Sequence, residues 1–301
     1  MAQAQVRKAR DDRDWPFQVT PLHPVLGCEI TGITLAEAVS PAIFAKVYEA
    51  FLAYELILFR DVDLPPALQV AFAKNFGEVN VHVLSQYHGY GHPEIYMLTN
   101  KDKDGKPTGK HPDRGTLYWH TDGSWKERTG QATMMYSEEL PPPGQGGETQ
   151  FADMYWGYEN LPAAIKKKIE GKNGSLRAIH NFTFSRKRRH EEDPLTAKQS
   201  AEVPPVAHPI VRTHPQTGRK AIFLGDHAES IEGMPYDEGR ALIEEINVLT
   251  TPPENVYSHV WQPRECMVWD NRCTLHRATG FDESRYIRVM RRCTITGEKP
   301  V

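Results

Sequence analysis

The apolar residues in the first third of the chain follow two different periods. Over residues 41–52 they recur at intervals of three and four, which predicts an amphipathic helix. The four apolar residues 56–59 form a run of strand length and predict a buried strand. A second helix is expected over residues 66–76, because Gly77 is suited to cap its C-terminal end.

The rest of the chain is dominated by short runs of β-branched and aromatic residues separated by Gly and Pro turns. Further helices are expected between residues 162 and 171 and over residues 235–249. Many short strands with such turns are typical of a sandwich or barrel, so we expect a mainly β fold with helices packed outside it. Strands are expected within residues 17–33 and at residues 94–98, 132–137, 148–152, 209–213, 220–224, 256–261, 266–269 and 286–294.

An aromatic stretch, residues 117–125, contains a His-x-Asp pair. On an extended strand successive side chains alternate between faces, so His120 and Asp122 would point the same way. A neutral imidazole and a carboxylate that converge on one point can begin a metal site. The same pattern occurs at His111 and Asp113, in a Lys- and Gly-rich loop where no strand period supports it. The pair alone therefore does not identify the site.

Two arginines lie at alternate positions near the C-terminus. Arg288, Met290 and Arg292 would share one face of a strand. Cationic side chains that point into a β-barrel are costly unless they meet anions. A guanidinium group matches a carboxylate with two parallel hydrogen bonds, so a dicarboxylate ligand would supply the missing partners.

Composition narrows the class of protein. The chain has 301 residues, long enough for a full core, and a formal net charge of −3, which gives no reason to expect a nucleic-acid partner. Its four cysteines include no CxxC pair, which favours a reduced, cytoplasmic protein. The sequence has neither a membrane-spanning apolar run nor a secretory signal. Residues 1–15 are expected to be disordered and residues 16–301 to form a single domain.

Taken together, the motifs resemble the taurine dioxygenase and dichlorophenoxyacetate dioxygenase family of iron(II)- and 2-oxoglutarate-dependent oxygenases. The resemblance extends over about residues 18–300 and implies a double-stranded β-helix, the cupin-like jelly roll. It is carried by His120-Thr121-Asp122, Gly146-Gly147-Glu148-Thr149, Trp269-Asp270-Asn271-Arg272 with His276, and Arg288 to Arg292.

The resemblance implies that His120, Asp122 and His276 bind iron(II) as a facial triad, which leaves three coordination positions open. Asp270, inside the Trp-Asp-Asn-Arg motif, is expected to brace a turn instead. The fold must then bring the distant His276 back to the His-x-Asp pair.

The resemblance also implies the co-substrates. 2-Oxoglutarate would chelate the iron through its C1 carboxylate and keto oxygen, and its far carboxylate would pair with Arg288 and accept a hydrogen bond from Thr149. Arg292 would lie nearer the chelated end. With O2, the reaction would yield succinate and CO2 and hydroxylate a C–H bond of a substrate. If the hydroxylated carbon bears a leaving group, the product would collapse to an aldehyde or keto acid.

The implied substrate is a small organic anion, aryloxyalkanoate-like or another carboxylate, with a taurine-like sulfonate as the alternative. His82, Thr116, His227 and Arg292 are the candidate substrate contacts. Gly225-Asp226-His227-Ala228 favours the dichlorophenoxyacetate branch. Thr116 departs from the pattern of the taurine enzyme, which has an asparagine there.

Other interpretations stay open. A non-catalytic cupin that binds a metal or ligand, or a zinc hydrolase with the same three ligands, would need the same triad. Family members are often dimers or tetramers, so a homo-oligomer is expected. Residues 101–115 and 183–205 are candidate lids. The basic run 186–189 is expected to lie in a solvated loop, because acidic residues follow it at once.

Overall fold

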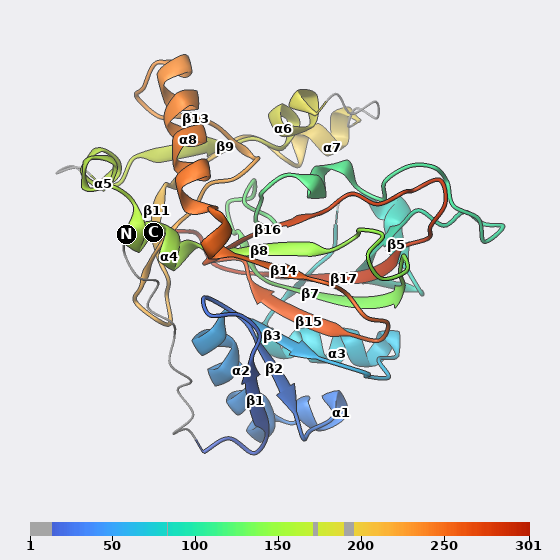
Figure 1. Ribbon diagram of the computed structural model, residues 1–301. Coiled ribbons are helices and arrows are strands. Elements are labelled where there is room, and N and C mark those ends of the chain that lie inside the picture. Colours follow the sequence, from blue (N-terminus) through green and yellow to red (C-terminus); the bar gives the residue numbers. More distant parts are fainter. Residues whose placement is uncertain (1–13, 83, 171–173, 190–195) are drawn as a thin grey trace.

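As Figure 1 shows, the computed structural model of this protein describes residues 14–82, 84–170, 174–189 and 196–301. The segment expected to be disordered, residues 1–15, lies outside the described residues except for its last two. One of these, Trp15, stacks on Phe17 with ring centroids 5.8 Å apart and contacts the apolar core. The packed region therefore includes Trp15.

The largest sheet among the described residues has nine strands. In spatial order its path contains β1 (Gln18–Pro21), β2 (Cys28–Thr31), β3 (Leu56–Phe59), β15 (Cys266–Asp270), β7 (Gly130–Glu139), β17 (Val289–Thr296), β6 (His92–Thr99) and β5 (His88–Gly89), with β4 (Val79–Asn80) paired to β17. Strands β2 and β3 run parallel, and the other neighbours are antiparallel.

Helices cover one face of this sheet. The helix α1 (Leu35–Ala38) leads into α2 (Pro41–Tyr54), and α3 (Pro66–Phe76) follows β3 (Figure 1). Side chains of β3 alternate between faces, as expected for a strand. Ile57 and Phe59 join the core beneath α2 and α3, whereas Leu56 and Leu58 join the apolar layer on the opposite face.

A smaller antiparallel sheet packs against that opposite face. It contains β14 (Val256–His259), β8 (Thr149–Asp153) and β16 (Thr274–Ala278) in spatial order. Phe151 of β8 and Trp269 of β15 are fully buried between the sheets, with ring centroids 5.3 Å apart. Two facing sheets around an apolar layer form a jelly roll, so the mainly β fold with flanking helices is confirmed.

The remaining elements extend the molecule on the side of the smaller sheet (Figure 1). Several of them share a second apolar core with β8 and β16. They are the sheet of β10 (Val206–Pro209), β9 (Arg177–His180) and β13 (Ala228–Ile231), the pair β11 (Val211–Thr213) and β12 (Lys220–Ile222), and the helices α4 (Met154–Asn160), α5 (Ala163–Glu170), α6 (Phe182–Arg188), α7 (Ala197–Ala201) and α8 (Tyr236–Thr250). Short 3-10 turns lie at η1 (Ser85–Tyr87), η2 (Arg114–Leu117) and η3 (Pro253–Asn255).

Two local predictions are wrong. Residues 117–125 do not form a strand: His120 makes a single β-bridge and residues 122–125 form a turn, since Gly123 adopts φ +72°. The basic run 186–189 is not a solvated loop but the end of α6, and the Arg189 side chain is 5% exposed. Residues 190–195, which include the acids that follow this run, lie outside the described residues.

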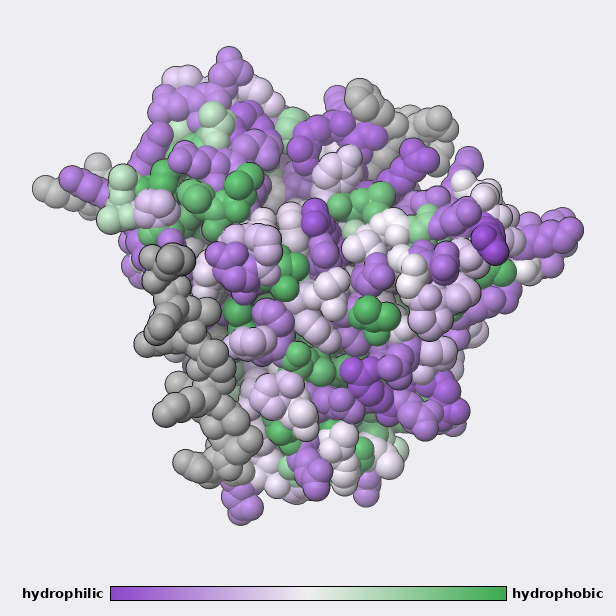
Figure 2. Space-filling view, in the orientation of Figure 1, coloured by the Kyte–Doolittle hydropathy of each residue, from purple (hydrophilic) through white to green (hydrophobic). Residues whose placement is uncertain are grey.

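The surface is that of a protein whose apolar side chains are mostly inside. The face in Figure 2 is mainly hydrophilic, with apolar side chains in small separate groups. Within the described ranges, no helix combines the length and apolar character needed to cross a bilayer.

The turn after β15 contains a buried ion pair. Both carboxylate oxygens of Asp270 accept hydrogen bonds from the Arg272 side chain, at 2.8 and 2.6 Å, and both residues are 1% exposed. His214 Nε2 lies 3.1 Å from the same carboxylate and donates to it, because its Nδ1 accepts from the backbone N–H groups of Gln216 and Thr217. Asp270 thus braces a turn, as the sequence predicted.

Replacing Asp270 with Ala should strongly destabilise the protein, because it leaves the Arg272 charge buried without its counter-ion. We expect the free energy of unfolding to fall by about 3–5 kcal/mol. Urea denaturation followed by circular dichroism measures the change. Lys168→Ala, which removes an exposed ion pair with Glu238, serves as the control and should cost less than about 1 kcal/mol. Equal losses in the two variants would contradict this role for Asp270.

Candidate active site

Two histidines far apart in the sequence are joined by their backbones. The N–H of His120 donates to the carbonyl of His276 at 3.0 Å, and the N–H of His276 donates to the carbonyl of His120 at 2.8 Å. Their rings lie 4.2 Å apart between centroids. Asp122 approaches both: its Oδ1 is 4.0 Å from His120 Nε2 and its Oδ2 is 3.6 Å from His276 Nε2. The three predicted metal ligands therefore converge on one point.

The two imidazoles are neutral, so their contacts with the Asp122 carboxylate are not ion pairs. Burial lowers the pKa of His120 and takes that of His276 well below its ordinary value. The Nδ1 of His120 lies 2.8 Å from the carbonyl of Tyr118, so it carries the proton and leaves Nε2 free to bind a metal.

Asp122 is held as a carboxylate by its neighbours. Burial alone raises its pKa, but the Arg292 charge, with a hydrogen bond from Thr133, more than offsets this and holds the pKa well below the usual range. Arg292 Nη1 lies 3.2 Å from Oδ1, and the Thr133 hydroxyl donates to Oδ2 at 2.6 Å. Each carboxylate oxygen of Asp122 therefore has a donor, Arg292 or Thr133, and each also faces a histidine ring.

Asn271 connects this carboxylate to the Trp-Asp-Asn-Arg turn. Its amide nitrogen donates to the Thr133 hydroxyl at 2.9 Å, and its Oδ1 accepts from the Trp269 indole at 3.1 Å. Its backbone carbonyl accepts from the Thr121 hydroxyl at 2.7 Å. The turn therefore holds Thr121, which precedes Asp122 in the chain, and Thr133, which donates to the Asp122 carboxylate.

The donor set fits a divalent first-row metal. Two neutral imidazoles and one carboxylate, with all three donor atoms within 4.8 Å, are the ligands of a facial triad. A second cluster, His214, Asp270 and Cys273, meets the same distance criterion. There the carboxylate is occupied by Arg272, and burial raises the pKa of the Cys273 thiol well above its ordinary value, so that cluster is a structural network.

Arg288 is a buried cation whose guanidinium has no partner among the described residues. It is 5% exposed, and its guanidinium forms no hydrogen bond or ion pair with any residue that the structure describes. Burial lowers its pKa to about 10, so it remains charged at neutral pH. Its backbone is anchored, since its N–H donates to Asn100 Oδ1 at 2.8 Å. A buried charge of this kind needs an anion.

The Gly-Gly-Glu-Thr motif lies beside this guanidinium. A Cβ on Gly147, which adopts φ +85°, would lie 3.6 Å from Cδ and 3.7 Å from Nε of Arg288, so a side chain there would crowd the cation. Thr149 begins β8 two residues later, and its hydroxyl accepts from the Trp261 indole at 2.8 Å. Its own proton remains available, so Thr149 and Arg288 both offer donors suited to a carboxylate.

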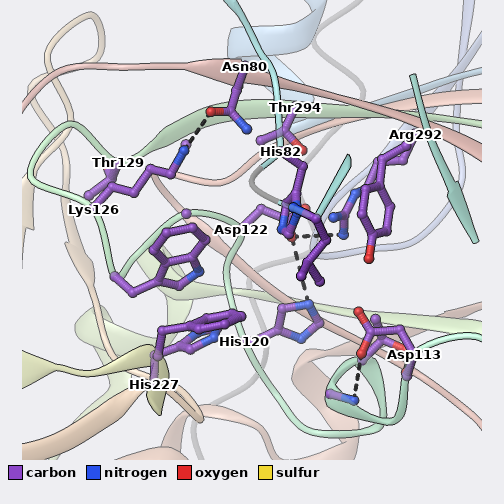
Figure 3. Close-up of a pocket in the computed structure, with 18 of the residues that line it drawn as sticks. Asn80, His82, Asp113, His120, Asp122, Lys126, Thr129, His227, Arg292 and Thr294 are labelled. Atoms are coloured by element: carbon purple, nitrogen blue, oxygen red, sulfur yellow. Dashed lines mark hydrogen bonds and ion pairs between the residues drawn. The ribbon is translucent and has the colours of Figure 1, made fainter. Parts of the chain in front are cut away.

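A cleft opens beside His120 and Asp122 (Figure 3). The space within it, open mouth included, is about 770 Å³. All four candidate substrate contacts border it: His82, Thr116, His227 and Arg292. His276, Thr149 and Arg288 do not belong to its lining.

The histidines of the cleft are neutral donors or acceptors. Burial lowers the pKa of His82 to about 3, and its Nδ1 accepts from the Leu84 N–H at 3.1 Å, so Nε2 carries the proton. Burial also takes the pKa of His227 well below its ordinary value, and its Nδ1 lies 3.2 Å from the Ser124 hydroxyl.

Residues from both candidate lids border the cleft. Asp113 belongs to the loop 101–115, and Arg186 and Arg189 belong to the basic run. His111, the rival metal ligand, is not part of either metal-binding cluster and packs against Phe281 with ring centroids 5.8 Å apart.

The residues that support the candidate ligands were not predicted from the sequence. Thr133, Asn100 and Asn271 carry ordinary side chains, and their roles depend on which strands are neighbours. Asn271 alone had a signal, since it lies inside a motif that the resemblance already singled out.

Comparison with known proteins agrees with this geometry. A family model described as "Taurine catabolism dioxygenase TauD, TfdA family" matches residues 18–294. An alpha-ketoglutarate-dependent 2,4-dichlorophenoxyacetate dioxygenase of Burkholderia sp. (strain RASC) is 33% identical over 286 residues, which cover 92% of this chain and 94% of that protein. An (S)-phenoxypropionate/alpha-ketoglutarate-dioxygenase of Sphingobium herbicidovorans is 30% identical, with 94% of this chain and 96% of that protein covered.

A solved structure is similar over nearly the whole chain. The crystal structure of AAD-2 in complex with Mn(II) and N-oxalylglycine matches with a TM-score of 0.78 at 30% identity, and covers 94% of this chain and 98% of that chain. The expected family is therefore confirmed: the chain belongs to the taurine catabolism dioxygenase TauD, TfdA family.

Proposed function

We propose that this protein hydroxylates a C–H bond of a small organic anion, with His120, Asp122 and His276 as the iron ligands and Arg288 as the anchor of 2-oxoglutarate. As a family member it is an iron(II)- and 2-oxoglutarate-dependent dioxygenase that uses O2 as co-substrate and forms succinate and CO2. The observation that carries the residue assignments is the convergence of the triad beside a cleft, together with a buried arginine that has no partner among the described residues.

Neighbouring residues hold two of the three proposed ligands in the state that a metal requires. His120 presents Nε2 because Nδ1–H is held by the Tyr118 carbonyl, and Asp122 is kept ionised by Arg292 and Thr133. Bound iron(II) would supply the activation of O2, chemistry that amino-acid side chains lack. The protein itself positions the ligands, keeps the Asp122 carboxylate charged and keeps the imidazoles neutral.

Arg288 and Thr149 would bind the far carboxylate of 2-oxoglutarate. The guanidinium can donate two parallel hydrogen bonds to a carboxylate, and the Thr149 hydroxyl can donate a third. Neither residue belongs to the lining of the cleft, so we assign the cleft to the substrate.

The substrate we propose is an aryloxyalkanoate-like or other carboxylate, in line with the two relatives named for such acids. Within the cleft, His82 would donate from Nε2, while Thr116, His227 and Arg292 would complete the polar contacts. Trp125 and Phe182 supply apolar surface, with ring centroids 4.7 Å apart. A sulfonate is the alternative headgroup within the same family.

Three further features belong to the proposal. Residues 16–301 would form one domain, which the family match over residues 18–294 supports. A cytoplasmic location is supported by Cys266, Cys273 and Cys293, which are buried and form no disulfide among the described residues. A homo-oligomer, dimer or tetramer, rests on family resemblance, and light scattering of the purified protein tests it.

Arg288→Ala should weaken 2-oxoglutarate binding by about 100-fold, since a desolvated carboxylate would lose its counter-ion. Anaerobic titration of the iron(II) protein with 2-oxoglutarate, followed by the visible charge-transfer band of the chelate, measures the affinity. Iron binding should be unchanged, and Arg288→Lys should recover part of the loss. Unaltered affinity would refute the assigned role. If the wild-type protein gives no band, the alternative of a non-catalytic metal- or ligand-binding cupin is favoured.

Thr133→Val should weaken metal binding by about 10-fold to 100-fold, because Asp122 Oδ2 loses its donor while the side chain keeps its volume. Competition between the protein and a chelator for Co(II) gives the affinity. Thr133→Ser keeps the hydroxyl and should retain near-wild-type affinity. Equal affinity in the Val variant would show that Thr133 does not support the carboxylate.

The reaction itself is tested with iron(II), ascorbate, 2-oxoglutarate and a panel of carboxylates and sulfonates. We expect substrate-dependent succinate with at least one member, and loss of that succinate in His276→Ala. No succinate above background with any member would overturn the proposed substrate class. Turnover supported by zinc alone would instead indicate a hydrolase.

A further inference from the structure

The basic side chains around the cleft differ in their partners. Arg292 lies 3.2 Å from Asp122, and Arg128 lies 3.0 Å from Glu78. Arg189 forms an ion pair with Asp226. Each of these three charges is therefore compensated by a carboxylate of the protein itself.

Lys126 is different. Its ammonium donates to the neutral amide oxygen of Asn80 at 2.6 Å and lies 5.0 Å from the centroid of the Trp125 ring. It forms no ion pair within the part of the chain that the structure describes. The side chain is half-buried, and this burial lowers the pKa of Lys126, which Glu202 and Glu78 partly offset from a distance. A charge placed in a cleft with only a neutral partner can accept an anion at little further desolvation cost.

The surroundings of Lys126 suit an oxyanion. Asn80, Thr129 and Thr294 line the same part of the cleft and carry amide or hydroxyl groups. In Figure 3 Lys126, Thr129 and Asn80 gather at one end, Asp113 lies at the opposite end, and Asp122 and His120 lie between them. The single acid of the lining that is not a proposed metal ligand is thus far from Lys126 in this view.

An apolar surface adjoins this polar end. Trp125 precedes Lys126 in the chain and is 5% exposed, and its ring packs against Phe182 of α6. An amphipathic ligand could therefore place its headgroup at Lys126 and its apolar body against Trp125 and Phe182.

We propose that Lys126, supported by Asn80, is the anchor for the anionic headgroup of the substrate, which is an amphipathic monoanion with an apolar body. The inference rests on the proposed function and adds to it, because Arg292 is already committed to Asp122. An ammonium is a compact point charge that does not demand the planar geometry of a carboxylate. The shared chemistry is therefore an oxyanion, carboxylate or sulfonate.

The test uses protein loaded with Mn(II) and N-oxalylglycine, so that the metal site and the Arg288 site are filled and turnover is prevented. Three ligands with one skeleton are then titrated by calorimetry: phenylacetate, phenylmethanesulfonate and the uncharged phenylacetamide. We expect at least one of the two anions to bind more tightly than the amide. The tighter anion identifies the headgroup.

Lys126→Met should weaken the binding of that anion by about 10-fold to 100-fold and change the binding of phenylacetamide by less than about twofold. Lys126→Arg should restore most of the affinity. Lys299→Met is the matched control, because Lys299 is exposed and pairs with Glu127 at 2.9 Å, and it should change neither.

The contrary outcomes are distinct. Equal weakening of anion binding and amide binding in Lys126→Met would assign Lys126 a structural role and overturn the proposal. An anion affinity that the substitution leaves unchanged would overturn it as well. No preference for either anion over the amide in wild-type protein would overturn it too. If N-oxalylglycine itself fails to bind the Mn(II) protein, the proposed function fails first, so the two failures are told apart.

Discussion

The pair of backbone hydrogen bonds between His120 and His276 is the contact on which the site depends. It joins a loop that precedes β7 to a strand of the smaller sheet. Because β16 is held by β8, and β8 by β14, the position of His276 is set by the jelly roll as a whole. A metal site assembled in this way cannot form before the two sheets face each other, so the closing of the fold and the completion of the site are one event.

Electrostatics then divides the site into compensated and uncompensated charges. Asp122 and Arg292 neutralise each other, and Asp270 and Arg272 do the same in the turn after β15. Arg288 and Lys126 have no acidic partner in the described part of the chain. A folded protein bears the cost of such cations where ligands provide the counter-charge. Lys126 lines the cleft and Arg288 does not, so the proposed anchors of the substrate and the co-substrate are separate cations.

The support of the ligands is shared among elements remote in sequence. Thr133 comes from β7, Asn271 from the turn after β15, and Tyr118 from the loop before the triad. Two of these contacts use side chains whose type is common, and the third uses a backbone carbonyl. For this reason the sequence motifs pointed to the candidate metal ligands and to Arg288 and Arg292, but not to the residues that orient the ligands.

The sequence by itself determined the large elements and the chemical types of the site. The period of apolar residues predicted α2, β3 and α3 within a residue or two, and the resemblance identified the family and suggested the triad. Only the tertiary structure decided that residues 117–125 bend at Gly123 instead of continuing as a strand, and that Arg189 is buried against Asp226. Only it showed that Arg292 has a carboxylate partner, whereas Lys126 and Arg288 have none in the part of the chain that the structure describes. The reason is physical: periodicity records which face of a local element is buried, whereas the partner of a charge is chosen by segments that meet when the sheets close.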